Sequence, residues 1–182
     1  MNIPNILTLS RIAVIPLIVA LVMMHNTTAQ WIAFALYVTT ALTDFLDGYL
    51  ARKMKLVSPL GRMLDPIADK LIVGALLITF AFDGSFSTAL TFAAIFIIMR
   101  EIAVSGLREH LGPQNIVIPV SGIAKYKTTS QLVALGFVMV LPIVPGLQLV
   151  ATATLWLATG LTLYTGYEYF AGAWPHLIKE EK

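Results

Sequence analysis

Long apolar stretches separated by short polar connections run along the whole chain. A helix needs about 17 to 25 mainly apolar residues to cross the roughly 30 Å hydrocarbon layer of a bilayer. Six stretches have about that length, and we predict membrane-spanning helices at 7–25, 31–51, 63–82, 86–109, 127–143 and 147–171, after a short interfacial segment at 2–6. The chain contains no internal repeat and no long linker, which predicts one all-α membrane domain over residues 1–182.

Basic residues are unevenly distributed among the connections. The connections "HNTTAQ", "DGSFS" and "LPIVPG" contain no Lys or Arg, whereas the other two connections and the C-terminal end do, and Arg11 lies near the start of the first span. Because cytoplasmic loops of membrane proteins are enriched in Lys and Arg, both termini and the second and fourth connections are predicted to be cytoplasmic. The protein is therefore expected to be a multi-pass protein of the cell inner (cytoplasmic) membrane.

Composition supports this class. Of the 182 residues, 58% are hydrophobic and 12% charged, against about 45–50% and about 25% in soluble domains. The chain has no cysteine, which excludes disulfide and thiol chemistry, and no nucleic-acid partner is expected. A cleavable signal peptide is the alternative for the first apolar stretch, but its single Arg and poor cleavage site favour a true span.

Four aspartates lie where the second predicted span ends and the third begins: Asp44, Asp47, Asp65 and Asp69. Spacings of three and four place each pair on one helix face. At 1.5 Å per residue, Asp44 lies about 20 Å along its span, at the inner edge of the hydrocarbon. Because the linker between the two spans is short, we expect antiparallel neighbouring helices whose four carboxylates face one another.

Clustered carboxylates repel one another, and protonation or a divalent cation must relieve that repulsion. Oxygen ligands suit Mg²⁺ or Mn²⁺, and four carboxylates could hold two ions. Taken singly, Asp65 could be a helix cap before Pro66. Asp44 and Asp47 could be interfacial residues paired with Arg52 or Lys53. Two matched pairs in spans favour a functional site, because acidic residues there are costly.

Basic residues of the fourth span and the connection after it form a second candidate site. Arg100 and Arg108 are eight residues apart on nearly the same helix face, and Lys125 and Lys127 follow. Arginine binds phosphate through two parallel hydrogen bonds, so we predict that at least two of the four bind a substrate phosphate. For Lys127, snorkelling and loop topology are a sufficient alternative, and Arg100 could pair structurally with its neighbour Glu101.

The acidic residues form the motif Asp44-x-x-Asp47-Gly48-x-x-Ala51-Arg52, eight residues, Gly61-x-x-x-Asp65-x-x-x-Asp69. This motif is similar, without departure, to the signature of the CDP-alcohol phosphotransferases. The segments "NIPNILTLSRI", "MREIAVSGLREH" and "GIAKYKTTSQ" resemble bacterial members whose acceptor is sn-glycerol 3-phosphate. The resemblance thus covers nearly the whole chain, although the last span is only generically apolar.

The resemblance implies a six-span homodimer that transfers the phosphatidyl group of CDP-diacylglycerol to sn-glycerol 3-phosphate and releases CMP at the cytoplasmic face. It implies that the four aspartates bind Mg²⁺ or Mn²⁺ and that Asp69 is also the general base. The motif positions that line the CDP site are Gly48, Arg52 and Gly61, and Asn5 and Thr8 match residues near the nucleotide.

Three alternatives remain at this stage. A member of the same family could use another acceptor: serine, inositol phosphate or a second phosphatidylglycerol. Aspartate-rich membrane prenyltransferases also use metal and pyrophosphate, but they are longer. A non-enzymatic divalent-ion transporter would also place acidic residues in spans, yet here all four aspartates lie at one end and no polar path continues through the outer halves of the spans.

Overall fold

The computed structural model describes residues 3–53, 59–114, 116–118 and 122–179, and these residues are almost entirely helical. Two short 3₁₀ turns, Gly112–Gln114 and Pro145–Leu147, accompany the long helices. The six α-helices are α1 (Ile3–Met23), α2 (Thr27–Lys53), α3 (Pro59–Phe82), α4 (Thr88–Leu111), α5 (Ile123–Val140) and α6 (Gln148–Lys179). The all-α prediction is confirmed.

Residues 3–6 belong to α1, so the separate interfacial segment predicted at 2–6 is not present among the described residues. Pro4 lies in the first turn of this helix, where a missing N–H removes no intrahelical hydrogen bond.

Three of the helices are long and apolar enough to cross a membrane, within the part of the chain that the structure describes. They are Asn5–Met23, Thr88–Gln114 and Pro145–Ile178. In α3, by contrast, Asp65, Asp69 and Lys70 fall within the N-terminal half, so the apolar length of that helix is shorter. The structure therefore gives six helices at the six predicted places, three of which have the length and composition of a span.

Polar side chains define the turns at one end of the molecule. Asn26 Oδ1 accepts hydrogen bonds from the backbone N–H groups of Thr28 and Ala29 (2.8 and 3.3 Å), which caps α2. Ser87 caps α4 in the same way through the N–H of Leu90 (3.4 Å). Between α3 and α4, Gly84 has φ +81°, a conformation that favours glycine.

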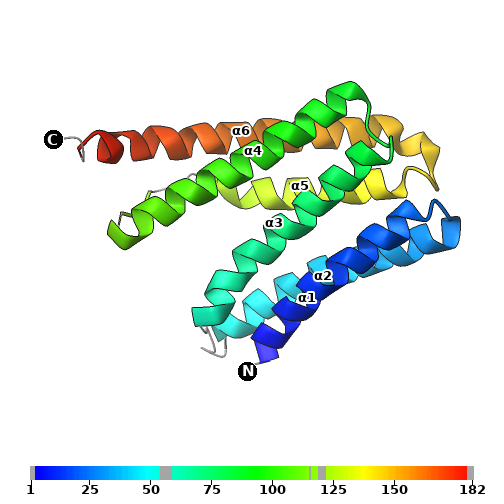
Figure 1. Ribbon diagram of the computed structural model, residues 1–182, viewed down its shortest axis with the longest axis horizontal. Coiled ribbons are helices and arrows are strands. Elements are labelled where there is room, and N and C mark those ends of the chain that lie inside the picture. Colours follow the sequence, from blue (N-terminus) through cyan, green and yellow to red (C-terminus); the bar gives the residue numbers. More distant parts are fainter. Residues whose placement is uncertain (1–2, 54–58, 115, 119–121, 180–182) are drawn as a thin grey trace.

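The helices do not follow the predicted order of neighbours. We expected α2 and α3 to pack as an antiparallel pair, but α1 packs against both of them, while α2 also packs against α5 (Figure 1). On the other side, α6 packs against α4 and α5. Within the described residues, the prediction of α2 and α3 packed directly side by side was wrong. A short linker fixes only the ends of two helices, whereas lateral packing decides what lies between them.

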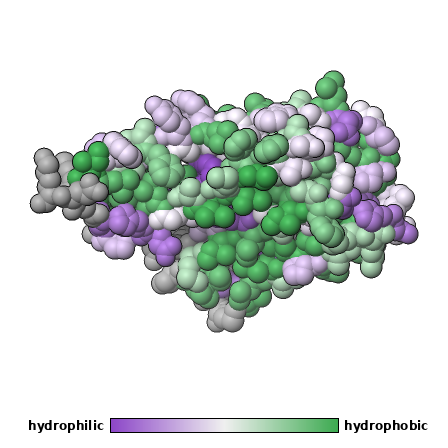
Figure 2. Space-filling model, turned by 45° about the horizontal axis from the view of Figure 1, so that its top comes forward, coloured by the Kyte–Doolittle hydropathy of each residue, from purple (hydrophilic) through white to green (hydrophobic). Residues whose placement is uncertain are grey.

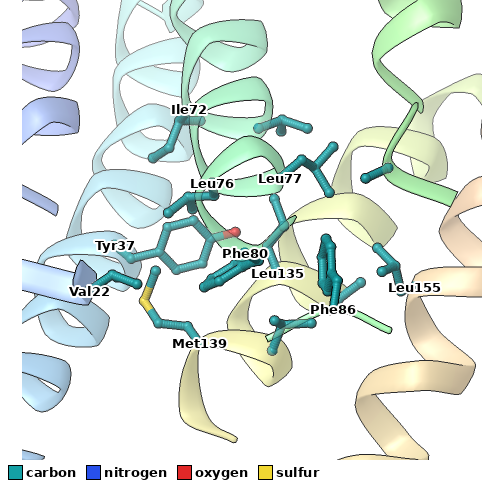
Figure 3. Close-up of a cluster of buried hydrophobic side chains, with 14 of the residues drawn as sticks. Val22, Tyr37, Ile72, Leu76, Leu77, Phe80, Phe86, Leu135, Met139 and Leu155 are labelled. Atoms are coloured by element: carbon teal, nitrogen blue, oxygen red, sulfur yellow. The ribbon is translucent and has the colours of Figure 1, made fainter. Parts of the chain in front are cut away.

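The bundle has two chemically different ends. The α1–α2, α3–α4 and α5–α6 turns lie together on the right of Figure 1, and the start of α3, the end of α4 and both chain ends lie away from them. Buried apolar side chains fill the half near the three turns, including Tyr37, Leu77, Phe80, Leu135 and Met139 (Figure 3). The opposite half contains most of the buried charged residues, together with a smaller apolar cluster formed by Leu107, Leu111, Ile118 and Ala173.

The outer surface is mostly apolar between the ends. In Figure 2, hydrophobic residues cover the middle of the visible face, and hydrophilic residues gather mainly toward its two ends. Exposed apolar side chains such as Phe82, Ile102 and Leu149 are 77%, 67% and 79% accessible. A surface of this kind suits contact with lipid, which agrees with the expected membrane setting.

Candidate active site

A buried arginine of α1 gathers carboxylates from the helices on either side of it. The Arg11 side chain is 6% exposed and forms an ion pair with Asp44 of α2. Its Nη2 atom lies 3.6 Å from Oδ1 of Asp65 of α3. The hydroxyl of Thr8 donates to the same Asp65 oxygen at 2.9 Å and accepts from Arg11 Nη2 at 3.2 Å. The two predicted carboxylate helices therefore meet through α1.

Asp69 lies beside this group. It follows Asp65 by one helical turn on the same face of α3, and together with Arg11 and Asp44 it lines a small cavity between α1, α2 and α3. Of the four predicted metal ligands, the structure brings together Asp44, Asp65 and Asp69. Among the described side chains, no group of three or more His, Cys, Asp or Glu is arranged to hold one metal ion.

A second pocket, of about 160 Å³, lies between α3, α4 and α5. Its lining is strongly polar: Asp69, Lys70, Arg100, Glu101, Ser105, Arg108, Lys127, Thr128 and Gln131 all contribute to it. Three of the four predicted phosphate-binding residues, Arg100, Arg108 and Lys127, thus line one pocket. Asp69 lines this pocket as well as the small cavity beside Arg11, so it joins the carboxylate site to the cationic one.

Helix α6 supports the cationic pocket from outside. Arg100 Nη2 donates to the hydroxyl of Thr165 at 3.1 Å, and the Arg108 guanidinium lies 6.0 Å from the ring centroid of Tyr169. Gly166 makes room for Arg100, because a Cβ atom there would lie 2.8 Å from Arg100 Cγ. The sequence had shown α6 only as an apolar span.

An apolar groove of about 630 Å³ runs between α2 and α5 and reaches the carboxylate site. We call it the α2–α5 groove; it is lined by Trp31, Phe34, Tyr37, Val38, Ala41, Leu42, Asp44, Thr128, Thr129, Leu132, Val133, Gly136, Phe137, Val140 and Leu147. Asp44 also lines the cavity beside Arg11, and Thr128 also lines the cationic pocket. One continuous region therefore offers an apolar groove, a carboxylate site and a cationic pocket.

The remaining predicted residues are placed as follows. Asn5 and Thr8 are buried in α1, 6% and 1% exposed, and Gly61 is buried near the start of α3. Asp47, Gly48 and Arg52 belong to the helical backbone of α2, but their surroundings lie outside the described residues, as does the Lys125 side chain.

Sequence reasoning missed Arg11 as a site residue. It is the one charged residue inside the first apolar stretch, and charged residues within spans are rare and usually functional. That signal was present in the sequence. The partners of Arg11 could not be predicted from the sequence, because Asp44 and Asp65 lie 33 and 54 residues further along the chain, on other helices.

Comparison with known proteins identifies the family of the chain. Residues 1–164 match the model of the CDP-alcohol phosphatidyltransferase family. A Rickettsia typhi protein named CDP-diacylglycerol–glycerol-3-phosphate 3-phosphatidyltransferase is 42% identical over 172 residues, 93% of this chain and 95% of the relative. A Cereibacter sphaeroides protein of the same name is 36% identical over 100% of this chain and 99% of the relative. A protein of Oryza sativa named cardiolipin synthase (CMP-forming) is 34% identical over 98% of this chain and 59% of the relative. The chain therefore belongs to the CDP-alcohol phosphatidyltransferase family.

Proposed function

We propose that this protein transfers the phosphatidyl group of CDP-diacylglycerol to sn-glycerol 3-phosphate and releases CMP. The observation that carries the proposal is the position of Asp69, which lines both the cavity beside Arg11 and the cationic pocket. A base at this junction can meet a donor held on the carboxylate side and an acceptor held on the cationic side. The names of the bacterial relatives point to the same pair of substrates.

The cationic pocket suits the acceptor. Its volume is small, about 160 Å³, and its lining combines arginine and lysine with hydroxyl and amide groups. Arg100, Arg108 and Lys127 would bind the phosphate of sn-glycerol 3-phosphate, with Lys125 as a fourth member of the predicted set. The neutral polar groups of Ser105, Thr128 and Gln131 suit a polyol backbone.

The α2–α5 groove suits the lipid part of the donor. It is predominantly lined by apolar side chains and ends at Asp44. An acyl chain lying in it would bring the donor's phosphates to the carboxylate site. The cytidine part would then lie near Asn5, Thr8, Gly48, Arg52 and Gly61, the positions that the family resemblance assigns to nucleotide binding.

The carboxylates Asp44, Asp47, Asp65 and Asp69 would hold Mg²⁺ or Mn²⁺, one ion or two. The donor set fits a hard cation, because Asp44 and Asp65 already converge on one positive group, the Arg11 guanidinium, and carboxylate oxygens are preferred Mg²⁺ ligands. When bound, such ions neutralise the charge that develops on the pyrophosphate. Thr8 and Arg11 orient Asp65 from the α1 side.

In the proposed reaction the acceptor hydroxyl oxygen attacks the lipid-bearing phosphorus. The bond from that phosphorus to the bridging oxygen breaks, CMP departs with the electron pair, and the hydroxyl proton passes to the carboxylate of Asp69. General-base assistance of this kind is typically worth about 10²–10⁴-fold in rate. Asp69 is suited to the role because it alone among the described acidic residues lines both compartments.

The proposed setting is a six-span homodimer in the inner membrane, with both termini and the active site facing the cytoplasm. The separation of the three Lys- and Arg-free turns from both chain ends supports this orientation (Figure 1). Homodimer formation rests on the family resemblance.

A same-family enzyme with another acceptor is the second candidate. The cardiolipin synthase from Oryza sativa favours it, because the name shows that this fold family contains relatives with a different product. Phosphatidylglycerol, serine or inositol phosphate would then replace sn-glycerol 3-phosphate. The cationic pocket argues against serine, which carries no phosphate.

The test uses the purified full-length protein in detergent with CDP-diacylglycerol and Mg²⁺. CMP release is measured with sn-glycerol 3-phosphate, serine, inositol phosphate and phosphatidylglycerol in parallel. We expect rapid release with sn-glycerol 3-phosphate alone, loss of release with a chelator, and recovery with added Mg²⁺ or Mn²⁺. Rapid release with another acceptor alone would replace the assignment, and release that survives chelation would refute the metal requirement.

A further inference from the structure

Glu101 is a buried carboxylate for which the proposed reaction has no role. It lies in the middle of α4 beside Arg100, and its side chain is 11% exposed. A buried carboxylate is costly unless charged or hydrogen-bonding groups compensate it. Glu101 Oε1 accepts hydrogen bonds from Lys127 Nζ, from Arg100 Nη1 at 3.3 Å and from Gln131 Nε2 at 3.2 Å.

The three donors that converge on Glu101 all line the cationic pocket. Lys and Arg have long side chains with many rotamers, and ordering them costs conformational entropy. Glu101 limits that freedom for Lys127 and Arg100 before any substrate is bound. The result is a preorganised pair of cations from two different helices, α4 and α5.

Further contacts fix the same group from the α6 side. Gln131 Nε2 also donates to the hydroxyl of Thr162 at 2.8 Å, and Arg100 Nη2 donates to Thr165. Arg100 Nε is buried without a hydrogen-bond partner within the described structure. The network therefore connects α4, α5 and α6 and has Glu101 at its centre.

The charges of the pocket lining agree with a dianionic ligand. Four cations (Lys70, Arg100, Arg108 and Lys127) face two carboxylates (Asp69 and Glu101), which leaves a formal charge of +2. A phosphate monoester carries about −1.5 to −2 at neutral pH. Glu101 thus lowers the charge of the pocket while fixing the direction of two of its cations.

We propose that Glu101 is a positioning residue that holds Lys127 and Arg100 in the geometry that binds the acceptor phosphate. The proposal rests on the proposed function, since it needs a phosphate-bearing acceptor in this pocket. Glu101 itself does not contact the reacting atoms in this scheme. It acts on acceptor affinity and not on the chemical step.

The experiment compares Glu101→Ala and Glu101→Gln in the full-length protein by steady-state kinetics with both substrates. In Glu101→Ala the KM for sn-glycerol 3-phosphate should rise about tenfold, because two cations lose a charged hydrogen-bond partner. Its kcat and its KM for CDP-diacylglycerol should stay within about twofold. In Glu101→Gln the amide oxygen keeps a hydrogen-bond acceptor but not the charge, so the acceptor KM should rise clearly less than in Glu101→Ala. Glu109→Ala, an exposed glutamate eight residues further along α4, is the matched control.

A second measurement tests whether Glu101 acts through Lys127. In a Lys127→Met background the further change to Glu101→Ala should raise the acceptor KM by less than it does in the wild type, because coupled residues are not additive. If Glu101→Ala is too unstable to purify, Glu101→Asp keeps the charge but withdraws the oxygen by one methylene, and it should raise the acceptor KM selectively.

Three results would overturn the proposal. They are an unchanged acceptor KM in Glu101→Ala, a lower kcat together with a rise in both KM values in that variant, or an acceptor KM in Glu101→Gln as high as in Glu101→Ala. These are distinct from failure of the proposed function, which would show as wild-type protein that releases no CMP with sn-glycerol 3-phosphate.

Discussion

At the scale of single residues, the site is organised by charges that compensate one another inside an apolar protein. Arg11 compensates Asp44 and Asp65, and Glu101 compensates Lys127 and Arg100. Asp69 lies between these two groups and lines the cavity of each. This position between the two groups is the basis of its proposed role as general base.

Replacing Asp69 by Asn should therefore abolish turnover. The amide cannot accept the hydroxyl proton, so we expect CMP release to fall by at least about 10²-fold, the lower end of general-base contributions. The measurement is CMP release at saturating substrates, with thermal unfolding in detergent to verify that the variant is folded. Asp83→Asn, at the opposite end of α3, is the control and should retain wild-type activity. Substantial turnover by a folded Asp69→Asn variant would exclude this residue as the base.

Residue spacing predicted part of this site, and the reason is local. Spacings of three, four and eight along a helix determine which side chains share a face, so Asp65 with Asp69 and Arg100 with Arg108 could be paired from the sequence alone. Arg11 with Asp44, and Glu101 with Lys127, are contacts between helices. They depend on lateral packing, which no local pattern specifies.

At the scale of helices, the sequence likewise predicted local features but not the packing between helices. Apolar length located all six helices, and polar caps such as Asn26 and Ser87 account for where α2 and α4 begin. The position of α1 between α2 and α3 could not be read from the linker length. The position of α1 depends on which apolar helix faces pack against each other. The helices are similarly apolar, so the sequence pattern does not specify this packing.

The α2–α5 groove makes a prediction at this scale. Gly136 lines it, and a Cβ atom added there would lie 3.6 Å from Tyr37 Cε1, in ordinary contact, so a larger side chain would extend into the groove. Gly136→Leu should fill part of the groove and raise the KM for long-chain CDP-diacylglycerol roughly tenfold, equivalent to about two methylenes at about 0.8 kcal/mol each. The acceptor KM should not change.

The chain length of the donor supplies the internal control. A short-chain CDP-diacylglycerol should lose much less affinity in Gly136→Leu than the long-chain donor does. Gly160→Leu, on α6 with open space around its Cα, should behave as the wild type with both donors. Equal effects on short and long donors would show that the acyl chain lies elsewhere.

At the scale of the whole molecule, the two ends differ in chemistry. One end has the three turns without Lys or Arg, and the other has the carboxylate site, the cationic pocket and the chain termini (Figure 1). This difference between the two ends suits a pair of substrates of which one is a lipid and the other is soluble in the cytosol. It is also the basis of the proposed orientation across the bilayer.

That orientation can be measured directly because the chain has no cysteine. Single cysteines at Thr28 and at Gly122 would report on the first and the fourth connection, respectively. In intact cells a membrane-impermeant maleimide should label Thr28→Cys, and it should label Gly122→Cys only after permeabilisation. The reverse pattern, in variants that retain activity, would invert the proposed topology.

The position of α1 between α2 and α3 has a consequence for the insertion of the protein into the membrane. Helix α1 precedes α2 and α3 along the chain, and it carries the guanidinium on which Asp44 and Asp65 converge. Its early insertion gives each acidic helix a counter-charge as soon as that helix enters the lipid, so neither must wait for the other. Deleting or reorienting α1 should therefore leave Asp44 and Asp65 without their shared ion-pair partner, although both aspartates are still present in the chain.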